Sequence, residues 1–325
     1  MPHSLPAEQR HLPVLRDRCV ELLLPALQHD GAVYVDGTLG MGGHATAILD
    51  AAPQARLVGI DRDAQALDLA RERLQRAGHG DRITLVHATY DRIPEVLDDL
   101  GLPGAAAILL DLGLSSFQID TDERGFSYAV DAPLDMRMDP DSGGPTAADL
   151  LADLPEEEIA RILHDLGDER HARRIARAVV RTRQAAPLTR SAQLVDLIEQ
   201  AVPAVARHRG GHPAKRSFQA LRIAVNRELE ILVDALEGAL DALLPGGRLA
   251  VESYHSGEDR LVKTAFHRRT TSSAPPGLPV ELEEHRPRFA ALTRGAEKAD
   301  DAELARNPRA ASVRLRAVER LSIPS

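Results

Sequence analysis

Residues that could do chemistry follow closely after a series of short apolar runs in this chain. The runs are rich in Val, Ile, Leu and Ala, which is typical of buried parallel strands. In open α/β sheets ligands bind at the carboxyl ends of the strands, so the residues found there are candidate site residues. They are Asp36, Asp61, Tyr90, Asp111 and His255. Three carboxylates at one edge are more than packing needs, and they indicate a binding site.

The segment from Val33 to Ala45 reads V-Y-V-D-G-T-L-G-M-G-G-H-A, which predicts a strand, a glycine loop and the start of a helix. Gly40-x-Gly42-x-x-Ala45 fits the dinucleotide fingerprint, but Asp36 precedes the glycines, where it would repel a pyrophosphate. An ammonium group would be attracted there. S-adenosylmethionine carries an α-ammonium and a sulfonium, whereas NAD carries no ammonium, so this cofactor fits better. A tight turn with a helix-capping Asp is the structural alternative.

A second carboxylate supports an adenosyl ligand without choosing between these cofactors. Asp61 ends the next apolar run and lies 18 residues after Gly43. A carboxylate at that place can accept hydrogen bonds from both hydroxyls of a ribose. Because both cofactors contain this ribose, Asp61 predicts the adenosine half of the ligand only.

The stretch after Asp111 is long and polar for a simple connection, so we expect it to be functional. It begins D-L-G-L-S-S-F-Q, in which Gln118 could contact polar cofactor atoms or could simply be solvated. Further on, Gly125 to Asp139 holds four flat or pliable apolar side chains among polar ones. They could sandwich a base or could anchor the loop, and the pattern leaves both open: Phe126, Tyr128, Met136 and Met138.

The charge distribution is strongly uneven. The whole chain has a net charge of −9, yet residues 159–227 hold 14 Lys or Arg and only 5 Asp or Glu. Five arginines fall on one side of a predicted helix, and no acid occurs from His171 to Arg190. They are Arg170, Arg173, Arg174, Arg177 and Arg181. Solvated helix faces usually mix both signs, so this stripe predicts binding to RNA or DNA phosphates. A second acid-free stretch, Arg207 to Arg227, includes Lys215 and Arg216.

Composition narrows the class of protein further. With 43% hydrophobic residues the 325-residue chain can form an ample core, built from aliphatic side chains because aromatics are only 3%. Cys19 is the single cysteine, which excludes an internal disulfide and a cysteine-cluster zinc site. The thirteen histidines show no two-His helix spacing with an acid, so no metal is expected. We expect a cytoplasmic protein without a membrane segment.

The periodicity predicts one α/β domain interrupted by helices. Strands are expected at 33–35, 55–60, 83–87, 105–110 and 248–253, with two more at 289–293 and 312–319. Helices are expected at 44–52, 64–76, 94–100 and 257–269, in a cluster at 146–153, 155–166, 168–184 and 190–201, and in one long element at 215–243. The helical cluster lies between the fourth and fifth strands and contains most of the basic segment.

Long motifs identify a family. They are H-L-P-V-L at 11–15, D-G-T-L-G-M-G-G-H at 36–44, I-D-R-D at 60–63, L-L-D-L-G-L-S-S at 109–116, E-R-G-F-S at 123–127, P-L-D-M-R-M-D at 133–139, H-P-A-K-R-S-F-Q-A-L-R-I at 212–223, H-S-G-E-D-R at 255–260 and N-P-R-A at 307–310. With these, the chain resembles the bacterial 16S ribosomal RNA cytosine-N4 methyltransferases of the MraW type over nearly its whole length.

The resemblance implies a class I methyltransferase with a Rossmann-like, mostly parallel sheet. It implies S-adenosylmethionine as methyl donor and a cytosine in the decoding region of 16S ribosomal RNA, within the small ribosomal subunit, as acceptor. The cofactor would be held by Gly42, Gly43, His44, Asp61, Tyr90, Asp111 and Gln118. We expect a discontinuous methyltransferase domain at 1–112 and 215–325 and an RNA-binding insertion at 113–214. Monomer and homodimer both stay open.

The acceptor chemistry needs a hydrogen-bond acceptor for the cytosine amine, whose lone pair is delocalised into the ring. Many exocyclic-amine methyltransferases use a Pro-Pro loop after the fourth strand, but here Asp111 is followed by Leu-Gly-Leu. The candidates for this role are therefore Asp111, Asp135 and His255. Two other classes compete with this hypothesis: an NAD-dependent oxidoreductase, and a non-catalytic RNA-binding protein with a relict cofactor fold.

Overall fold

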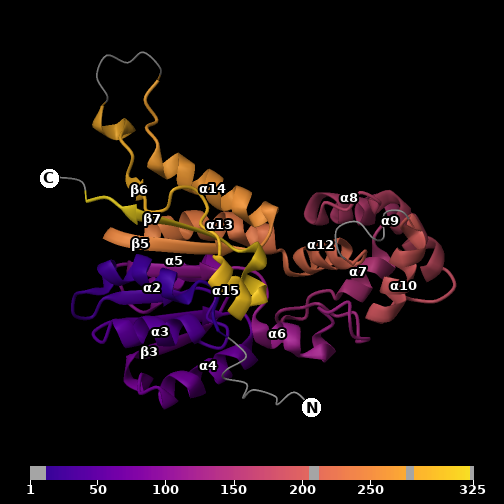
Figure 1. Cartoon of the computed structure of the whole chain (residues 1–325), viewed down its shortest axis with the longest axis horizontal. Helices are drawn as coiled ribbons and strands as arrows, with labels where there is room; N and C mark the ends of the chain where they lie inside the picture. The colour runs from indigo at the N-terminus through magenta and orange to yellow at the C-terminus, as the bar shows by residue number, and fades with distance from the viewer. Residues whose placement is uncertain (1–11, 205–211, 276–281, 323–325) are drawn as a thin grey trace. The chain divides into compact units, whose positions relative to one another are not determined.

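The computed structural model describes residues 12–204, 212–275 and 282–322. The chain folds into two compact units (Figure 1). The first, which we call the strand unit, contains the residues up to Gly113 and those from Glu230 onward; the second, the helical unit, is Leu114–Leu229. No helix in the described ranges is both long and apolar enough to cross a membrane.

The strand unit contains a seven-stranded sheet in the order β3-β2-β1-β4-β5-β7-β6. The strands are β1 Val33–Asp36, β2 Arg56–Asp61, β3 Ile83–His87, β4 Ala105–Asp111, β5 Leu243–Ser253, β6 Phe289–Ala291 and β7 Arg314–Arg320. Strands β1 to β5 pair in parallel, and β7 is antiparallel to both of its neighbours. The sheet is mostly parallel, as predicted.

Helices cover both faces of this sheet because its strands are apolar on both sides. One buried cluster joins Tyr34 and Leu109 to the helices α2 Arg16–Leu23, α3 Gly43–Ala51 and α4 Ala64–Arg76. The other joins Val35 and Leu110 to α5 Ile93–Asp99, α13 Glu228–Ala242 and α14 Ser256–Thr270. Successive residues of one strand thus enter opposite cores. A short helix, α15 Asp301–Arg306, precedes β7.

The helical unit has its own hydrophobic core. Its helices are α6 Ser116–Asp120, α7 Ala147–Asp153, α8 Glu156–Gly167, α9 Ala172–Arg183, α10 Ser191–Ala201 and α12 Lys215–Asn226. Helix α8 and α12 approach closely at Gly167, where a Cβ would lie 2.8 Å from the Cβ of Ala220. The core also contains Leu134 and Met136 from the long connection after Asp111.

Two boundaries differ from the prediction. The single long helix expected at 215–243 is wrong: α12 ends at Asn226 and α13 begins at Glu228, because Arg227 takes the left-handed conformation at φ 51°. The compact helical unit runs to Leu229, so it includes α12. The expected boundary at 214/215 would have placed α12 in the strand unit. The predicted loop from Arg207 to Pro213 lies mostly outside the described residues.

Two further elements start at other positions than expected. Strand β5 begins at Leu243 rather than at 248, and its register with β4 shifts near its start. Helix α9 starts at Ala172 rather than near 168, because Asp168 adopts a left-handed conformation that ends α8. Both differences are local and leave the element order unchanged.

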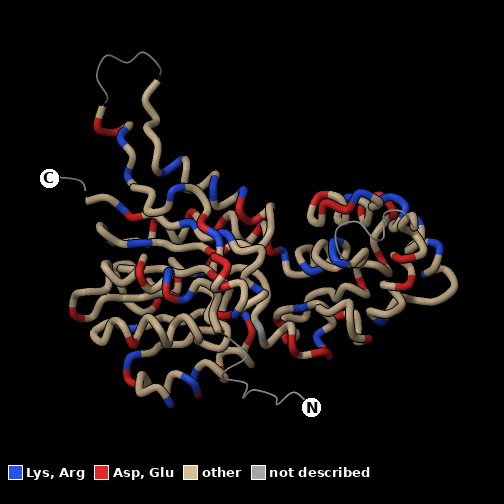
Figure 2. The backbone as a smooth tube through the Cα atoms, in the orientation of Figure 1, with Lys and Arg blue, Asp and Glu red and all other residues tan. Residues whose placement is uncertain are grey.

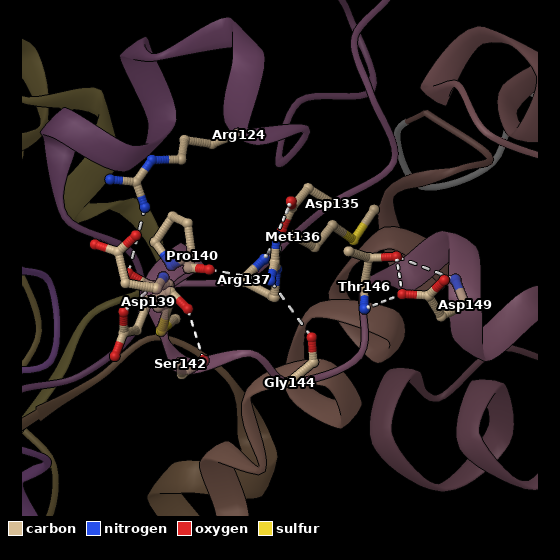
Figure 3. Close-up of polar contacts among 12 residues, drawn as sticks. Arg124, Asp135, Met136, Arg137, Asp139, Pro140, Ser142, Gly144, Thr146 and Asp149 are labelled. Carbon is tan, nitrogen blue, oxygen red and sulfur yellow. Dashed lines mark hydrogen bonds and ion pairs between the residues drawn. The ribbon is translucent and has the colours of Figure 1, made fainter.

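Residues 124–144 form a loop held by polar contacts rather than by regular structure (Figure 3). The Asn226 amide donates to the Met136 carbonyl at 2.7 Å, and its oxygen accepts from the Met138 amide at 2.8 Å. The Met136 amide donates to the Arg124 carbonyl at 3.0 Å. Met136 itself has φ 63° and a fully buried side chain. The E-R-G-F-S and P-L-D-M-R-M-D motifs therefore meet α12 in one network.

Gly125 and Gly143 give a matched test of this loop. Both have a left-handed φ, 72° and 71°, but a Cβ at Gly125 would overlap the Pro133 carbonyl oxygen, whereas a Cβ at Gly143 meets nothing within 4 Å. Both Ala variants carry the backbone strain, of about 1–2 kcal/mol. We predict that Gly125→Ala lowers the free energy of unfolding by about 1–3 kcal/mol more than Gly143→Ala does. Equal denaturant midpoints and slopes for the two variants would contradict this account of the loop.

Candidate functional site

The carboxyl end of β1 carries a buried carboxylate. Asp36 is 1% exposed, and its oxygens accept hydrogen bonds from the Tyr34 hydroxyl at 2.9 Å and from the Thr38 amide at 3.3 Å. Burial raises the pKa of Asp36 to about 6, although the nearby His44 opposes this shift. Asp36 therefore adds negative charge beneath the glycine loop, where the sequence predicted an attraction for cations.

Asp61, at the end of β2, organises the glycine loop. One of its oxygens accepts from the Gly40 amide at 2.7 Å, and the other accepts from the Asp63 amide at 2.9 Å. Burial raises the pKa of Asp61 to about 6, while these two hydrogen bonds lower it. Each carboxylate oxygen can accept a further hydrogen bond. Asp61 can thus hold the loop and still accept hydroxyl groups of a ligand.

Glycine is required on both sides of this loop. A Cβ at Gly37 would lie 2.6 Å from Leu110 Cδ2 and 3.2 Å from the Cβ of Tyr90, so Tyr90 packs directly against the turn after β1. A Cβ at Gly43 would lie 2.6 Å from Pro13 Cγ, which brings the H-L-P-V-L motif onto the start of α3. Gly42, with φ 74°, forms the N-cap of that helix. The loop motif is therefore a packed backbone turn.

Asp111, at the end of β4, is fixed by two hydroxyl groups. Its Oδ1 accepts from the Tyr254 hydroxyl at 2.8 Å, and its backbone amide donates to Thr38 Oγ1 at 2.6 Å. The side chain is 28% exposed, so a ligand can reach it. Burial, and next the negative charge of Glu252, raise the pKa of Asp111 to about 8. At neutral pH this carboxyl holds a proton more readily than an ordinary Asp does.

Sequence reasoning missed one member of this site, Glu252. It lies on β5 directly beside Asp111 on β4, and its side chain is 0% exposed. The Nε2 atom of His44 lies 3.5 Å from Glu252 Oε2 and 3.7 Å from Asp111 Oδ2. We call these three residues the carboxyl–histidine cluster. Their ligand atoms lie within 4.8 Å of one another, close enough to surround a small cationic group.

The sequence marks Glu252 as unusual, but only the register of the sheet shows which residue it lies beside. Glu252 directly follows the apolar run Leu249, Ala250 and Val251 in a strand. A charged residue in a buried strand is unusual unless it has a partner. Only the pairing of β4 with β5 shows that its partner is Asp111.

Two of the predicted acceptor residues have other roles in the structure. Both oxygens of Asp135 accept hydrogen bonds from the Arg137 guanidinium, at 2.8 and 2.7 Å (Figure 3). The Arg137 contacts oppose burial and leave the pKa of Asp135 below its ordinary value, which makes it a weak proton acceptor. His255 is the N-cap of α14, and its Nδ1 accepts from the Gly257 amide at 3.2 Å. Its Nε2 lies 3.2 Å from Glu258 Oε1.

Gln118 forms a capping box at the start of α6. Its side-chain oxygen accepts from the Ser115 amide at 3.2 Å, and its own amide donates to the Ser115 hydroxyl at the same distance. Gln118 and Asp135 belong to the helical unit, whereas the strand-end residues belong to the strand unit. The structure therefore brings together Asp36, His44, Asp61, Tyr90 and Asp111, with Glu252 added, within one unit.

The predicted basic stripe lies on the exposed side of α9. Figure 2 marks the Lys and Arg positions of the chain in blue. Helix α9 buries Ala172, Ile175, Ala176 and Val179, as expected. The exposed arginines are Arg173, Arg174, Arg177 and Arg181, with Arg170 just before the helix. Arg177 lies 3.5 Å from Glu156, and no ion pair of the other four is found among the described residues. Lys215 and Arg216, at the start of α12, are also exposed, and Arg216 donates to the Asp168 carbonyl at 3.1 Å.

Comparisons with known proteins identify the family of this chain. The sequence model of the MraW methylase family matches residues 8–321. A protein of Beutenbergia cavernae named "Ribosomal RNA small subunit methyltransferase H" is 60% identical over 311 residues, 96% of this chain and 92% of its own. Proteins of the same name from Leifsonia xyli and a Parafrankia species are 60% and 57% identical over 310 residues, each match covering 95% of this chain and 94% of theirs.

These matches decide between the competing hypotheses. A methylase family that matches nearly the whole chain leaves no support for an NAD-dependent oxidoreductase or for a relict binding protein. The chain belongs to the MraW methylase family, and its methyl donor is S-adenosylmethionine.

Proposed function

We propose that this protein transfers a methyl group from S-adenosylmethionine to the N4 amine of a cytosine in the decoding region of 16S ribosomal RNA. One observation supports this most strongly: an acidic site at the ends of β1, β2 and β4 lies in a chain whose relatives are named small subunit ribosomal RNA methyltransferases. The proposed substrate implies a cytoplasmic enzyme that acts on the small ribosomal subunit. Its state as monomer or homodimer follows from neither observation.

The residues present fit this cofactor. Gly42 and Gly43 form the turn into α3, and Asp61 can accept ribose hydroxyls while it holds the loop through the Gly40 amide. The unpartnered ring of His44 and the carboxyl of Asp111 offer polar contacts to the methionine half. Bound S-adenosylmethionine supplies an electrophilic methyl group on a sulfonium. We include Tyr90 as an apolar wall and Gln118 as a further cofactor contact.

Asp111 is the best candidate for the group that accepts a hydrogen bond from the cytosine amine. It is partly exposed, it is held in place by Tyr254, and its raised pKa suits a proton acceptor that works near neutral pH. Asp135 is satisfied by Arg137, and His255 is committed to capping α14. We therefore assign Asp111 the acceptor role in preference to the other two. The leaving proton of the amine would pass to its carboxyl.

The helical unit is the proposed RNA-binding part. Five exposed arginines along α9, with Lys215 and Arg216 on α12, can neutralise phosphates without adding a carboxylate of their own. RNA-binding residues in this proposal are Arg170, Arg173, Arg174, Arg177, Arg181, Lys215 and Arg216. The target base must also leave its stack before it can be methylated.

The proposed reaction can be tested with purified protein, methyl-labelled S-adenosylmethionine and small ribosomal subunits from a strain that lacks the gene. We expect label in N4-methylcytidine after nuclease digestion. Asp111→Asn should slow single-turnover transfer by ~10²–10⁴-fold, because a positioned proton acceptor is lost. If transfer recovers fully at saturating cofactor, Asp111 only binds the cofactor. Label in another nucleoside would reject the cytosine-N4 assignment.

Asp61→Ala should weaken S-adenosylmethionine binding by about 1–3 kcal/mol, because the ribose hydroxyls lose a charged acceptor and the loop loses its hydrogen bonds. Titration calorimetry measures this directly. Asp68→Ala, an exposed position on α4, is the matched control and should bind as the wild type does. If Asp61→Ala binds the cofactor with unchanged affinity, Asp61 is not part of the cofactor site.

Arg173→Ala combined with Arg174→Ala should weaken RNA binding and reduce the slope of log affinity against log salt by about one unit per lost phosphate contact. We choose this pair because Arg177 has Glu156 beside it. Arg76→Ala with Arg92→Ala removes the same charge from exposed positions of the strand unit and should leave the slope unchanged. Identical slopes in the two double variants would mean that the arginines of α9 are only solvated and do not bind phosphates.

A further inference from the structure

Glu252 is the buried group of the strand unit whose charge is hardest to explain by packing. Its side chain is 0% exposed, and one of its oxygens accepts a weak hydrogen bond from the Cys19 thiol at 3.4 Å. Its neighbour on β7 is the apolar Leu315. A carboxylate in such surroundings strongly destabilises the fold unless it is neutralised. The fold therefore needs either a proton or a cation at this position.

The atoms around Glu252 leave a polar group without a partner. In the part of the chain that the structure describes, both ring nitrogens of His44 and the Oε2 atom of Glu252 are buried without a hydrogen bond. His44 Nε2 is aimed between Glu252 and Asp111, at 3.5 and 3.7 Å. These distances are too long for good hydrogen bonds. Buried polar atoms left in this state point to a ligand that completes the cluster.

The charges that face Glu252 are mostly acidic. The titratable groups that act on this cluster come from several elements: Cys19 on α2, Asp36 on β1, His44 on α3, Asp111 on β4, Tyr254 after β5 and Glu303 on α15. Of these, His44 alone can become cationic. Asp111 is the member that solvent and ligands can reach, since its side chain is 28% exposed. Glu252, paired with it across the strands, is fully buried.

We propose that Glu252 is a positioning residue of the cofactor site: Asp111 and Glu252 hold a shared proton when the site is free, and binding of the cationic cofactor releases this proton to the solvent. The proposal rests on the proposed function only in taking S-adenosylmethionine as the ligand. The proton balance is simple, because one proton leaves the carboxyl pair as one positively charged ligand enters. No bond other than the O–H bond changes.

The acidities of the two carboxyls agree with this arrangement. Burial raises the pKa of Glu252 to about 8, although hydrogen bonds with Asp111 and Cys19 oppose the shift, and the pKa of Asp111 is also raised to about 8. At pH 7 the pair therefore keeps a proton in the free protein. A cation beside the pair lowers both pKa values and drives this proton off.

Proton release would also prepare the site for chemistry. A protonated Asp111 cannot accept the proton that leaves the cytosine amine. Once the cofactor has expelled the shared proton, Asp111 is a carboxylate that is ready to accept. Glu252 would thus make the base available only when the methyl donor is bound.

Calorimetric titration of S-adenosylmethionine in buffers of different ionisation enthalpy tests the proposal. In the wild-type protein at pH 7, with EDTA present, the observed heat should vary with the buffer and indicate release of about one proton per bound cofactor. Glu252→Gln keeps the shape of the side chain but cannot share a proton as a second carboxyl, so its release should fall to less than half. Glu319→Gln, on the neighbouring β7, makes the same change away from the cluster and should release protons as the wild type does. Protons from the amino group of the cofactor contribute equally in all three proteins, so they do not affect the comparison.

The pH dependence of stability gives a second readout that needs no ligand. A carboxyl whose pKa is raised in the folded state stabilises the protein at low pH and loses this effect as pH rises through the folded value. The melting temperature of the free wild-type protein should therefore fall as pH rises from about 5 to about 8, between the ordinary and the raised pKa of these carboxyls, and it should fall less in Glu252→Gln. Cofactor binding without proton release, or equal release in the wild type and Glu252→Gln, would overturn the proposal. Failure of the wild type to bind the cofactor at all would instead reject the proposed function.

Discussion

Everything in the strand unit depends on the parallel pairing of its central strands, which places negative charge at one edge of the sheet. Asp36, Asp61 and Asp111 end β1, β2 and β4, and Glu252 lies one position before the end of β5. Parallel strands end at the same edge, so the four carboxyls come together although they are up to 216 residues apart in sequence. The repulsion among Asp36, Asp111 and Glu252 is reduced by hydroxyl donors, a backbone amide and His44. The same repulsion makes the edge attractive to a cationic cofactor.

The helical unit carries exposed positive charge and folds around a core of its own. Its core is formed by the apolar sides of α8, α9, α10 and α12 together with the loop that follows Gly125. That loop has little regular structure, so its backbone groups are satisfied by Asn226, Arg124 and Arg137. The motif residues of this loop are largely used for its own folding. We therefore assign the proposed RNA binding to the exposed arginines of α9.

Much of this fold could be predicted from sequence, and the failures have identifiable causes. Strand-end aspartates were recognisable because Asp36, Asp61 and Asp111 each follow an apolar run, and the sided pattern of α9 is visible in its spacing. The break at Arg227 was not, since an arginine rarely adopts a left-handed conformation and neither Gly nor Pro marks the place. Glu252 was missed because strand register, not sequence, places it beside Asp111. The ion pair of Asp135 with Arg137 was not predicted either, because it forms only when the chain bends back over two residues.

Methylation of a cytosine of small subunit ribosomal RNA by this chain is tested most directly in cells. Ribosomal RNA from a strain that lacks the gene should be digested to nucleosides and analysed by mass spectrometry, with and without a plasmid that encodes the wild-type chain or Asp111→Asn. We predict that one methylated cytidine is lost from 16S RNA in the deletion strain, returns with the wild-type chain, and stays low with Asp111→Asn at equal protein level. An unchanged set of methylated cytidines in the deletion strain would contradict the claim.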